Sequence, residues 1–369
     1  MKVFHCGHCD QLVFFENTTC VNCDHILAFL PDVAEMGALE PEDASKGLWR
    51  LISSDSKPRS YRLCQNYSQE NVCNWAVPAD DPNAFCRSCR LTRTIPIIQG
   101  PSDRENWARV ETAKRRMIYS LLRLNLPVLT KAEDPEHGLA FDLLSEVPGG
   151  PPVMTGHDNG VITLNMAEGN DAERERRRLQ MNEPYRTLLG HFRHEIGHYY
   201  WNVLIDGTDW IDQYRSLFGD EREDYGEALK RHHANGAPAD WVNSYVSAYA
   251  SAHSWEDWAE TWAHYMHISD TLETAVASGL SLRPRRSDEP ALKPNIKVVG
   301  KWSASFDELI ERWFPLTYAL NNLSRGMGLQ DIYPFVLSPP AIDKLRFVHE
   351  VITETASTAR PAALATAAS

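Results

Sequence analysis

The sequence predicts an α+β protein: a cysteine-rich module at the N-terminus, then a mostly helical domain that contains a small sheet. Three observations predict this arrangement. All 8 cysteines of the 369 residues lie between Cys6 and Cys89. In the rest of the chain, apolar residues recur at the spacing of a helix. The residues that favour β-strands form only short runs there, and turn-forming residues separate these runs. The cysteine-rich part and the part with helical periodicity occupy separate stretches of the sequence, and the length of the chain suits about two domains.

The composition is that of an ordinary globular protein, with 43% hydrophobic and 24% charged residues. The net charge of −13 argues against nucleic acid as a partner, because binding a phosphate backbone requires an excess of Lys and Arg. The chain contains no run of about 18 apolar residues, so no membrane-spanning helix is expected. The first residues lack the apolar core of a secretory signal, and we therefore predict a cytoplasmic protein.

The cysteines form two groups of four whose spacing is typical of zinc sites. Two intervening residues let a pair of thiolates bind one tetrahedral ion, and two such pairs complete a closed structural site. Disulfides are not favoured, because the sequence shows no secretory signal. A redox-active cysteine pair is not favoured either, because it would need a βαβ context that is missing here. The predicted ligands are Cys6, Cys9, Cys20 and Cys23 for the first zinc ion, and Cys64, Cys73, Cys86 and Cys89 for the second.

Three histidines flank the first group, and each could replace a cysteine as a ligand. They are His5, His8 and His25. Because eight cysteines already suffice for two ions, we interpret these histidines as exposed side chains without a metal role.

Residues 1–95 are therefore interpreted as a zinc-ribbon module that holds two structural ions. Binding free energies of about 10–16 kcal/mol in zinc-finger peptides could offset the ordering of a segment with few core residues, such as 31–63. The Pro- and Gly-containing stretch 96–102 is predicted to be a linker. A second domain then covers 103–352, and the small polar residues of 353–369 predict a disordered tail.

Local patterns within the second domain predict several helices and two strands. Proline and glycine residues between these runs mark the turns. The predicted helices outside the central motifs are Asp103–Leu126, Phe306–Met327 and Pro339–Ile352, and the predicted strands are Leu139–Leu144 and Gly160–Asn165.

The strongest motif of the second domain is His194-Glu195-Ile196-Gly197-His198. On a helix, the two histidines lie one turn apart on one face, where both imidazoles can bind one zinc ion. The flanking residues are apolar, so the helix is expected to be buried, and buried imidazoles need a partner such as a metal. Glu195 would take the proton of a zinc-bound water and pass it to the leaving amine. Gly197 would allow a strand or the substrate to come close.

A catalytic zinc ion needs a third protein ligand and one open coordination position. Glu256 and Glu260 are the best candidates, because both lie on one stripe of a predicted helix beside tryptophan residues. We predict that Glu256 is the third ligand and that Glu260 accepts a hydrogen bond from a ligand histidine. The reverse assignment stays open, and His191 and His264 are weaker candidates as ligands.

Two motif blocks resemble known zinc peptidases. HExxH followed by the distant Glu256-Asp-Trp-Ala-Glu260 is similar to the gluzincin branch of zinc metallopeptidases, which includes toxin peptidases. The CGHC opening, with HEIGHYYW and WEDWAETWAHY, resembles more closely the bacterial zinc-binding metallopeptidases that carry an N-terminal zinc ribbon. No third histidine follows HExxH closely, so the sequence departs from the metzincin pattern.

This resemblance covers residues 1–350 and implies a zincin-like, mostly helical catalytic domain, with the HExxH helix beneath a small twisted sheet. It implies that the run Gly160–Asn165 is the edge strand that pairs with an extended substrate. It also implies that a tyrosine before the ligand glutamate stabilises the oxyanion. Tyr249 matches best, with Tyr245 and His253 as alternatives.

The leading hypothesis is a zinc-dependent metallopeptidase with one catalytic and two structural zinc ions, which cleaves a peptide or protein substrate. The ribbon is available for a protein partner, and neither nucleic acid nor a membrane is expected to bind. Two alternatives stay open. One is a catalytically idle scaffold of the same fold that binds partners through the ribbon, and the other is a zinc hydrolase that acts on a non-peptide amide.

Overall fold

The computed structural model divides the chain into two compact units, and each is described by itself. The ribbon unit comprises Val3–Arg123 and Pro127–Arg177, and the helical unit comprises Met1–Lys2, Leu124–Leu126 and Arg178–Ser369. The structure describes all residues except 53–57, 148, 181–185, 283–304 and 367–369. Within the described residues, none of the helices combines the length and the apolar character needed to cross a bilayer.

The N-terminal part of the ribbon unit consists mainly of β-strands. A two-stranded hairpin precedes a five-stranded antiparallel sheet whose strands are neighbours in chain order. The sequence shows few core residues in 31–63, yet this stretch supplies three strands, because Met36, Leu39 and Tyr61 are buried on the sheet. The elements are β1 (Phe4–His5), β2 (Leu12–Val13), β3 (Ile26–Leu30), β4 (Glu35–Asp43), β5 (Leu48–Leu51), β6 (Ser60–Leu63), α1 (Gln65–Ser68), β7 (Ala76–Pro78) and η1 (Cys89–Leu91).

One long helix, α2 (Pro101–Arg123), packs against the ribbon sheet. Its Tyr119 ring lies 5.5 Å from the Phe15 ring and 5.7 Å from the Phe29 ring, measured between centroids. These aromatic contacts form part of the core of the unit. The compact unit therefore continues across the stretch 96–102, for which the sequence predicts a linker.

A four-stranded sheet completes the ribbon unit, in the order β10-β11-β9-β8. β11 is parallel to β9 and antiparallel to β10, so it has a partner on both sides. The prediction that Gly160–Asn165 is an edge strand is therefore wrong. Asn159 and Gly160 have φ values of 47° and 76°, which allow the tight turn that folds β10 onto the edge of β11. The elements are β8 (Thr92–Thr94), β9 (Ala140–Leu144), β10 (Gly156–Asp158), β11 (Val161–Asn165), η2 (Met166–Gly169) and α3 (Asp171–Gln180).

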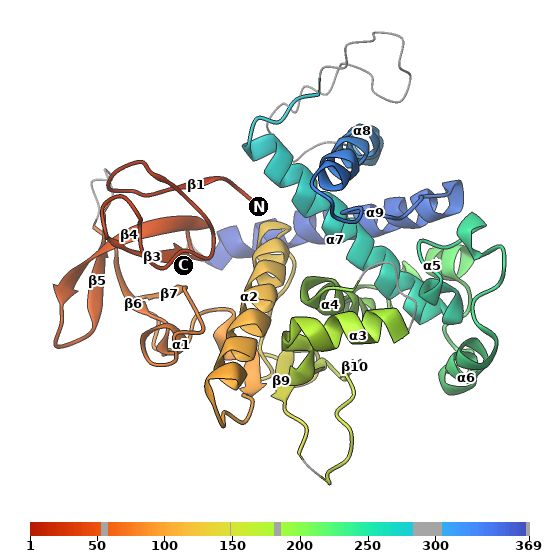
Figure 1. The fold of residues 1–369 in the computed structure, drawn as a ribbon, viewed down its shortest axis with the longest axis horizontal. Helices are drawn as coiled ribbons and strands as arrows, with labels where there is room; N and C mark the ends of the chain where they lie inside the picture. The colour runs from red at the N-terminus through yellow and green to blue at the C-terminus, as the bar shows by residue number, and fades with distance from the viewer. Residues whose placement is uncertain (53–57, 148, 181–185, 283–304, 367–369) are drawn as a thin grey trace. The chain divides into compact units, whose positions relative to one another are not determined.

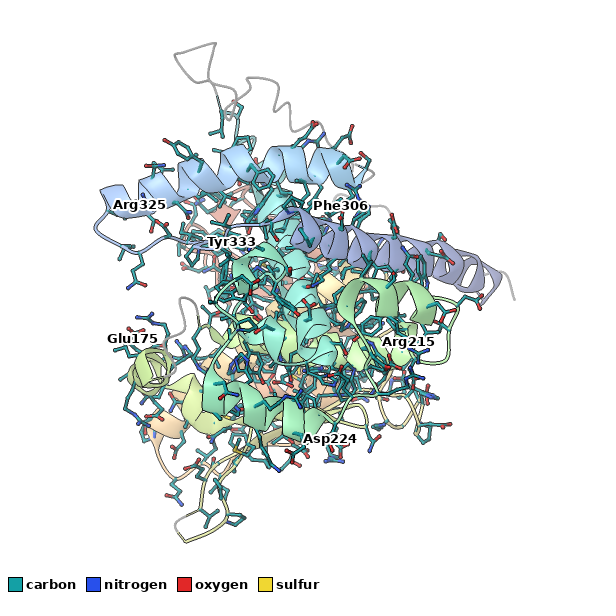
Figure 2. All side chains as sticks on the ribbon, turned by 90° about the vertical axis from the view of Figure 1, so that its right-hand side faces the viewer. Glu175, Arg215, Asp224, Phe306, Arg325 and Tyr333 are labelled. Carbon is teal, nitrogen blue, oxygen red and sulfur yellow. The ribbon has the colours of Figure 1, made fainter. Side chains whose placement is uncertain are left out.

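The central element of the helical unit is α7, which packs against α4, α5, α8 and α9 (Figure 1). Its Trp258 and Trp262 are fully buried in this core. In Figure 2, Asp224 marks the start of α6 and Phe306 the start of α8. The elements are α4 (Leu188–Leu204), α5 (Ile211–Phe218), α6 (Tyr225–Asn235), η3 (Trp241–Asn243), η4 (Tyr249–Ala252), α7 (Ser254–Ala277), α8 (Phe306–Gly326) and α9 (Pro339–Thr366).

The close approach of α4 and α7 depends on Gly197. A Cβ atom at this position would lie 3.0 Å from Ala259 Cα, and Trp258 Nε1 donates a hydrogen bond to the Gly197 carbonyl at 2.8 Å. From the sequence, a strand or the substrate is expected at this glycine. The element that approaches it is the helix α7, because only a residue without a side chain lets the two backbones come so close.

The last helix extends further than the sequence pattern predicts. The sequence pattern predicts a domain that ends at Ile352 and a disordered tail over 353–369, whereas α9 continues to Thr366, and 367–369 lie outside the described residues. Val351 and Ile352 are buried and anchor the helix. The residues beyond them include several alanines, the residue type with the highest helix propensity.

Candidate metal centres

The HExxH segment is helical because both its cap and its apolar face favour α4. The Thr187 side chain accepts a hydrogen bond from Gly190 N at 2.9 Å and caps the helix. Phe192 and Ile196 are fully buried and hold one face against the core. The second ligand helix, α7, is capped by His253, whose Nδ1 accepts a hydrogen bond from Trp255 N at 3.0 Å. Each helix therefore begins within two turns of the residues that carry the chemistry.

Three side chains from α4 and α7 converge on one point. His194 Nε2 lies 2.9 Å from Glu256 Oε2 and 3.2 Å from His198 Nε2, and His198 Nε2 lies 3.6 Å from the same carboxylate oxygen. A tetrahedral zinc ion with bonds of 2.0–2.2 Å separates its ligand atoms by about 3.3 Å. The three distances bracket this value, so the donor set fits one zinc ion.

The second glutamate of α7 meets the other face of His194. Glu260 Oε1 lies 2.7 Å from His194 Nδ1, and Glu260 Oε2 accepts a hydrogen bond from Ser247 Oγ at 2.6 Å. A proton held on Nδ1 leaves Nε2 with the lone pair that a metal requires. Glu256 thus faces both Nε2 atoms, whereas Glu260 faces the opposite ring nitrogen.

Burial and opposite charges act against each other at this cluster. Burial alone would raise the pKa of Glu256, but the charge of His198 and the hydrogen bond from His194 hold it well below its usual range. Burial would likewise lower the pKa of His194, but its hydrogen bonds to Glu256 and Glu260 raise it well above the ordinary value. The site therefore stabilises positive charge next to the buried Glu256 and the half-buried Glu260, which is the environment that a divalent cation needs.

Two tyrosines lie beside the cluster, and one of them was not predicted. The Tyr249 ring centroid is 6.0 Å from that of His194. The Tyr225 hydroxyl donates a hydrogen bond to Glu256 Oε1, whereas Oε2 of the same carboxylate lies next to the histidines. Burial raises the pKa of both phenols well above the ordinary value, and the charge of Glu256 raises it further. Both side chains are therefore neutral hydrogen-bond donors at neutral pH.

Sequence reasoning missed Tyr225 because no motif connects α6 to the HExxH helix. His232, on the same face of α6 two turns later, places its ring 5.8 Å from that of Tyr249. The spacing of Tyr225, the buried Ala228 and His232 is typical of one helical face. This spacing could have identified the face, but it does not show that the face packs against the His194 cluster.

The remaining candidates have other partners. His253 Nδ1 caps α7 and its Nε2 lies 3.2 Å from Glu223 O. The Tyr245 ring lies under Lys344 Nζ at 4.4 Å. His264 Nδ1 lies 2.6 Å from the Tyr333 hydroxyl. In the part of the chain that the structure describes, neither His191 nor His264 joins the His194 cluster.

Each group of four cysteines is gathered in space, and all eight thiols are free. The sulfur atoms of Cys6 and Cys23 are 3.7 Å apart, and those of Cys9 and Cys20 are 3.6 Å apart. In the second group, Cys73 and Cys86 are 3.8 Å apart. Four thiolates at 2.3 Å from a zinc ion are separated by about 3.8 Å, whereas a disulfide requires about 2.05 Å. The geometry fits two zinc ions and no disulfide among these pairs.

The comparisons with known proteins identify two families that match the chain. Residues 103–351 match the family described as "Putative zinc-binding metallo-peptidase", and residues 3–100 match the one described as "zinc-ribbon domain". An uncharacterised protein of Mycobacterium tuberculosis (strain H37Rv) and one of Mycobacterium bovis are each 44% identical over 363 residues, which is 98% of this chain and 98% of the relative. No solved structure matches the chain significantly. The family matches confirm the resemblance and the predicted α+β class with an N-terminal zinc ribbon.

Proposed function

We propose that this chain, which belongs to the family of zinc-binding metallopeptidases whose model it matches, hydrolyses peptide bonds at a zinc ion held by His194, His198 and Glu256. The observation that supports this most directly is the convergence of the three ligand atoms, with Glu195 directly after the first ligand on the same helix. When bound, the zinc ion would polarise the scissile carbonyl and lower the pKa of water to about 7.

Glu195 is the proposed general base. Its side chain is buried, and its negative charge is among the influences that raise the pKa of Tyr225 and Tyr249. Glu195 follows the ligand His194 directly on α4, next to the point where the three ligand atoms converge. From there it would accept a proton from the attacking water and return it to the leaving amine, a role that contributes typically about 10²–10⁴-fold to the rate.

Tyr249 is the proposed donor to the oxyanion of the tetrahedral intermediate. Its phenol stays protonated because burial and the neighbouring carboxylates disfavour the phenolate. A neutral donor that is already in place stabilises developing negative charge without reorganisation. Of the three candidates from the sequence, Tyr249 is the one whose ring lies against a proposed zinc ligand.

Two hydrogen bonds would orient the ligands. Tyr225 binds Glu256 Oε1 and so directs Oε2 toward the histidines, and Glu260 binds His194 Nδ1. Partners of this kind fix the orientation and the tautomer of metal ligands. The two cysteine sites would hold structural zinc, and eight free thiols suit the reducing cytoplasm, where we place the protein.

The test is a cleavage screen with an unbiased peptide library, comparing the wild-type chain with Glu195→Gln while zinc is quantified in both. Turnover should fall by about 10²–10⁴-fold in the variant, and the zinc content should stay the same because no ligand is changed. Glu227→Gln serves as the control, since it alters an exposed carboxylate of α6.

Three results would contradict the proposal in different ways. Full activity of Glu195→Gln would exclude the general-base mechanism. A zinc-loaded wild-type chain that cleaves no peptide would favour the idle scaffold. Hydrolysis of small amides without peptide cleavage would favour the non-peptide hydrolase.

A further inference from the structure

The Ser247 side chain lies between the metal cluster of α4 and α7 and the short turn η4 that carries Tyr249. The residue is buried, with only 7% of its surface exposed. Its Oγ lies 2.6 Å from Glu260 Oε2 and 3.1 Å from Ala250 N. One hydroxyl therefore contacts both the carboxylate that binds His194 and the backbone next to Tyr249.

The chemistry of the two partners fixes the direction of both hydrogen bonds. A backbone N–H can only donate, so Ala250 N donates to the Ser247 oxygen. An ionised carboxylate can only accept, so the single hydroxyl hydrogen of Ser247 goes to Glu260 Oε2. The hydroxyl is thus a donor on one side and an acceptor on the other, and it joins the two groups.

A continuous path of hydrogen bonds results. Its first part runs from Ala250 N–H through the Ser247 hydroxyl to Glu260 Oε2. Its second part runs from Glu260 Oε1 to His194 Nδ1 at 2.7 Å. His194 must carry its proton on Nδ1 whenever Nε2 binds a metal ion. A metal ion on Nε2 therefore favours the tautomer that completes the path, and hydrogen bonds in such a chain strengthen one another.

The far end of this path is the turn that positions Tyr249. Tyr249 is the first residue of η4, and the Ala250 N–H that Ser247 binds is the next amide in the chain. The Tyr249 ring is half-exposed, with its centroid 6.0 Å from that of His194. A shift of this turn would move the phenol, and a misplacement of about 1 Å in an active site can cost about 10²-fold in rate.

We propose that Ser247 is a positioning residue that couples metal binding at His194 to the placement of Tyr249. The inference rests on the proposed function, since it takes zinc at the His194 cluster and an oxyanion role for Tyr249 from there. A purely structural role would be to cap η4, because serine hydroxyls commonly accept from a backbone N–H a few residues later. Coupling is favoured because the same hydroxyl also donates to Glu260, the partner of a proposed zinc ligand.

The first test follows amide hydrogen exchange in the full chain, with zinc at the cysteine sites alone and with zinc at the His194 cluster as well. In the wild type, zinc at this cluster should slow exchange at Ala250 by about 2–10-fold, the effect of one typical hydrogen bond. In Ser247→Ala this zinc dependence should disappear. Ser251→Ala is the matched control, because it removes a hydroxyl of the same turn that donates to Ala248 O at 2.7 Å, and it should respond as the wild type does.

The second test uses a peptide that the wild type cleaves, at saturating zinc. Ser247→Ala should lower kcat by about 10–100-fold with little change in KM, because an oxyanion donor acts in the transition state. In the Tyr249→Phe background, Ser247→Ala should cause no further loss, since the hydroxyl that it positions is already absent. Matching circular dichroism spectra would show that the variants keep the fold.

The outcomes separate this inference from the proposed function. A zinc effect on exchange that is absent from the wild type, or equally large in Ser247→Ala, would overturn the coupling. An unchanged kcat, or a further loss in the Tyr249→Phe background, would overturn the positioning role. A zinc-loaded wild type that cleaves no peptide would contradict the proposed function, whereas the exchange measurement would still decide the coupling.

Discussion

Lys344 is a buried cation of the helical unit, and its removal tests how the region around the candidate site is held together. Its Nζ lies 2.5 Å from Asp257 Oδ2 and donates a hydrogen bond to Ser244 O at 2.9 Å. The two charged side chains are only 7% and 0% exposed. The same Nζ lies over the Tyr245 ring. Lys344 therefore ties α9 to α7 and to the segment that leads to Tyr249.

The structure allows the cost of Lys344→Met to be estimated. Removing one partner of a buried ion pair costs about 3–5 kcal/mol, and the lost cation–π contact adds to this. Burial raises the pKa of Asp257 to about 7 even with the lysine present, so without the lysine the carboxyl takes up a proton and limits the loss. We expect about 3–4 kcal/mol, or roughly 6–16 °C in Tm for a unit of this size.

The assay is thermal unfolding followed by circular dichroism. Lys230→Met is the matched control, because Lys230 Nζ lies 2.7 Å from Glu227 Oε1 but the two side chains are 74% and 58% exposed. Its Tm should stay near that of the wild type. The double variant Lys344→Met/Asp257→Asn should recover part of the loss, since no buried charge remains. A Lys344→Met chain as stable as the control would refute the reasoning.

Three other predictions follow from single contacts. Tyr225→Phe removes the hydroxyl that binds Glu256, so zinc affinity at the His194 cluster should fall by about 10–100-fold in a chelator competition. An unchanged affinity would show that the Glu256 carboxylate is oriented without the Tyr225 hydroxyl. Cys64→Ser should reduce the zinc content by one ion per chain and expose the ribbon unit to proteolysis, and a full zinc complement would contradict the second zinc site. Gly197→Val should lower the stability of the helical unit by about 1–3 kcal/mol in denaturant unfolding, because even a Cβ atom added at this position would lie 3.0 Å from Ala259 Cα of α7. A fully stable variant would mean that α4 and α7 can separate.

Sites whose ligands are close in the chain could be predicted from local spacing. CxxC and HExxH require only a knuckle or one helical turn, and the described residues place both cysteine groups and the two histidines within ligand distance of a common point. Helices were also predictable within 103–352, because α2 of the ribbon unit and α8 of the helical unit follow the apolar periodicity of the chain. The five-stranded sheet was not, because its longest middle strand, β4, shows no regular alternation of buried and exposed residues.

Contacts between distant segments required the folded chain. Spacing left Glu256 and Glu260 interchangeable, since both lie on one stripe of α7. The packing of α7 on α4 turns one carboxylate toward Nε2 of His194 and the other toward Nδ1. Tyr225 reaches Glu256 from 31 residues away, and His8 meets His25 only because two knuckles face each other. Local sequence thus determines which groups can bind a metal, whereas packing determines which atoms face it, because side-chain direction depends on how the helices and loops are placed.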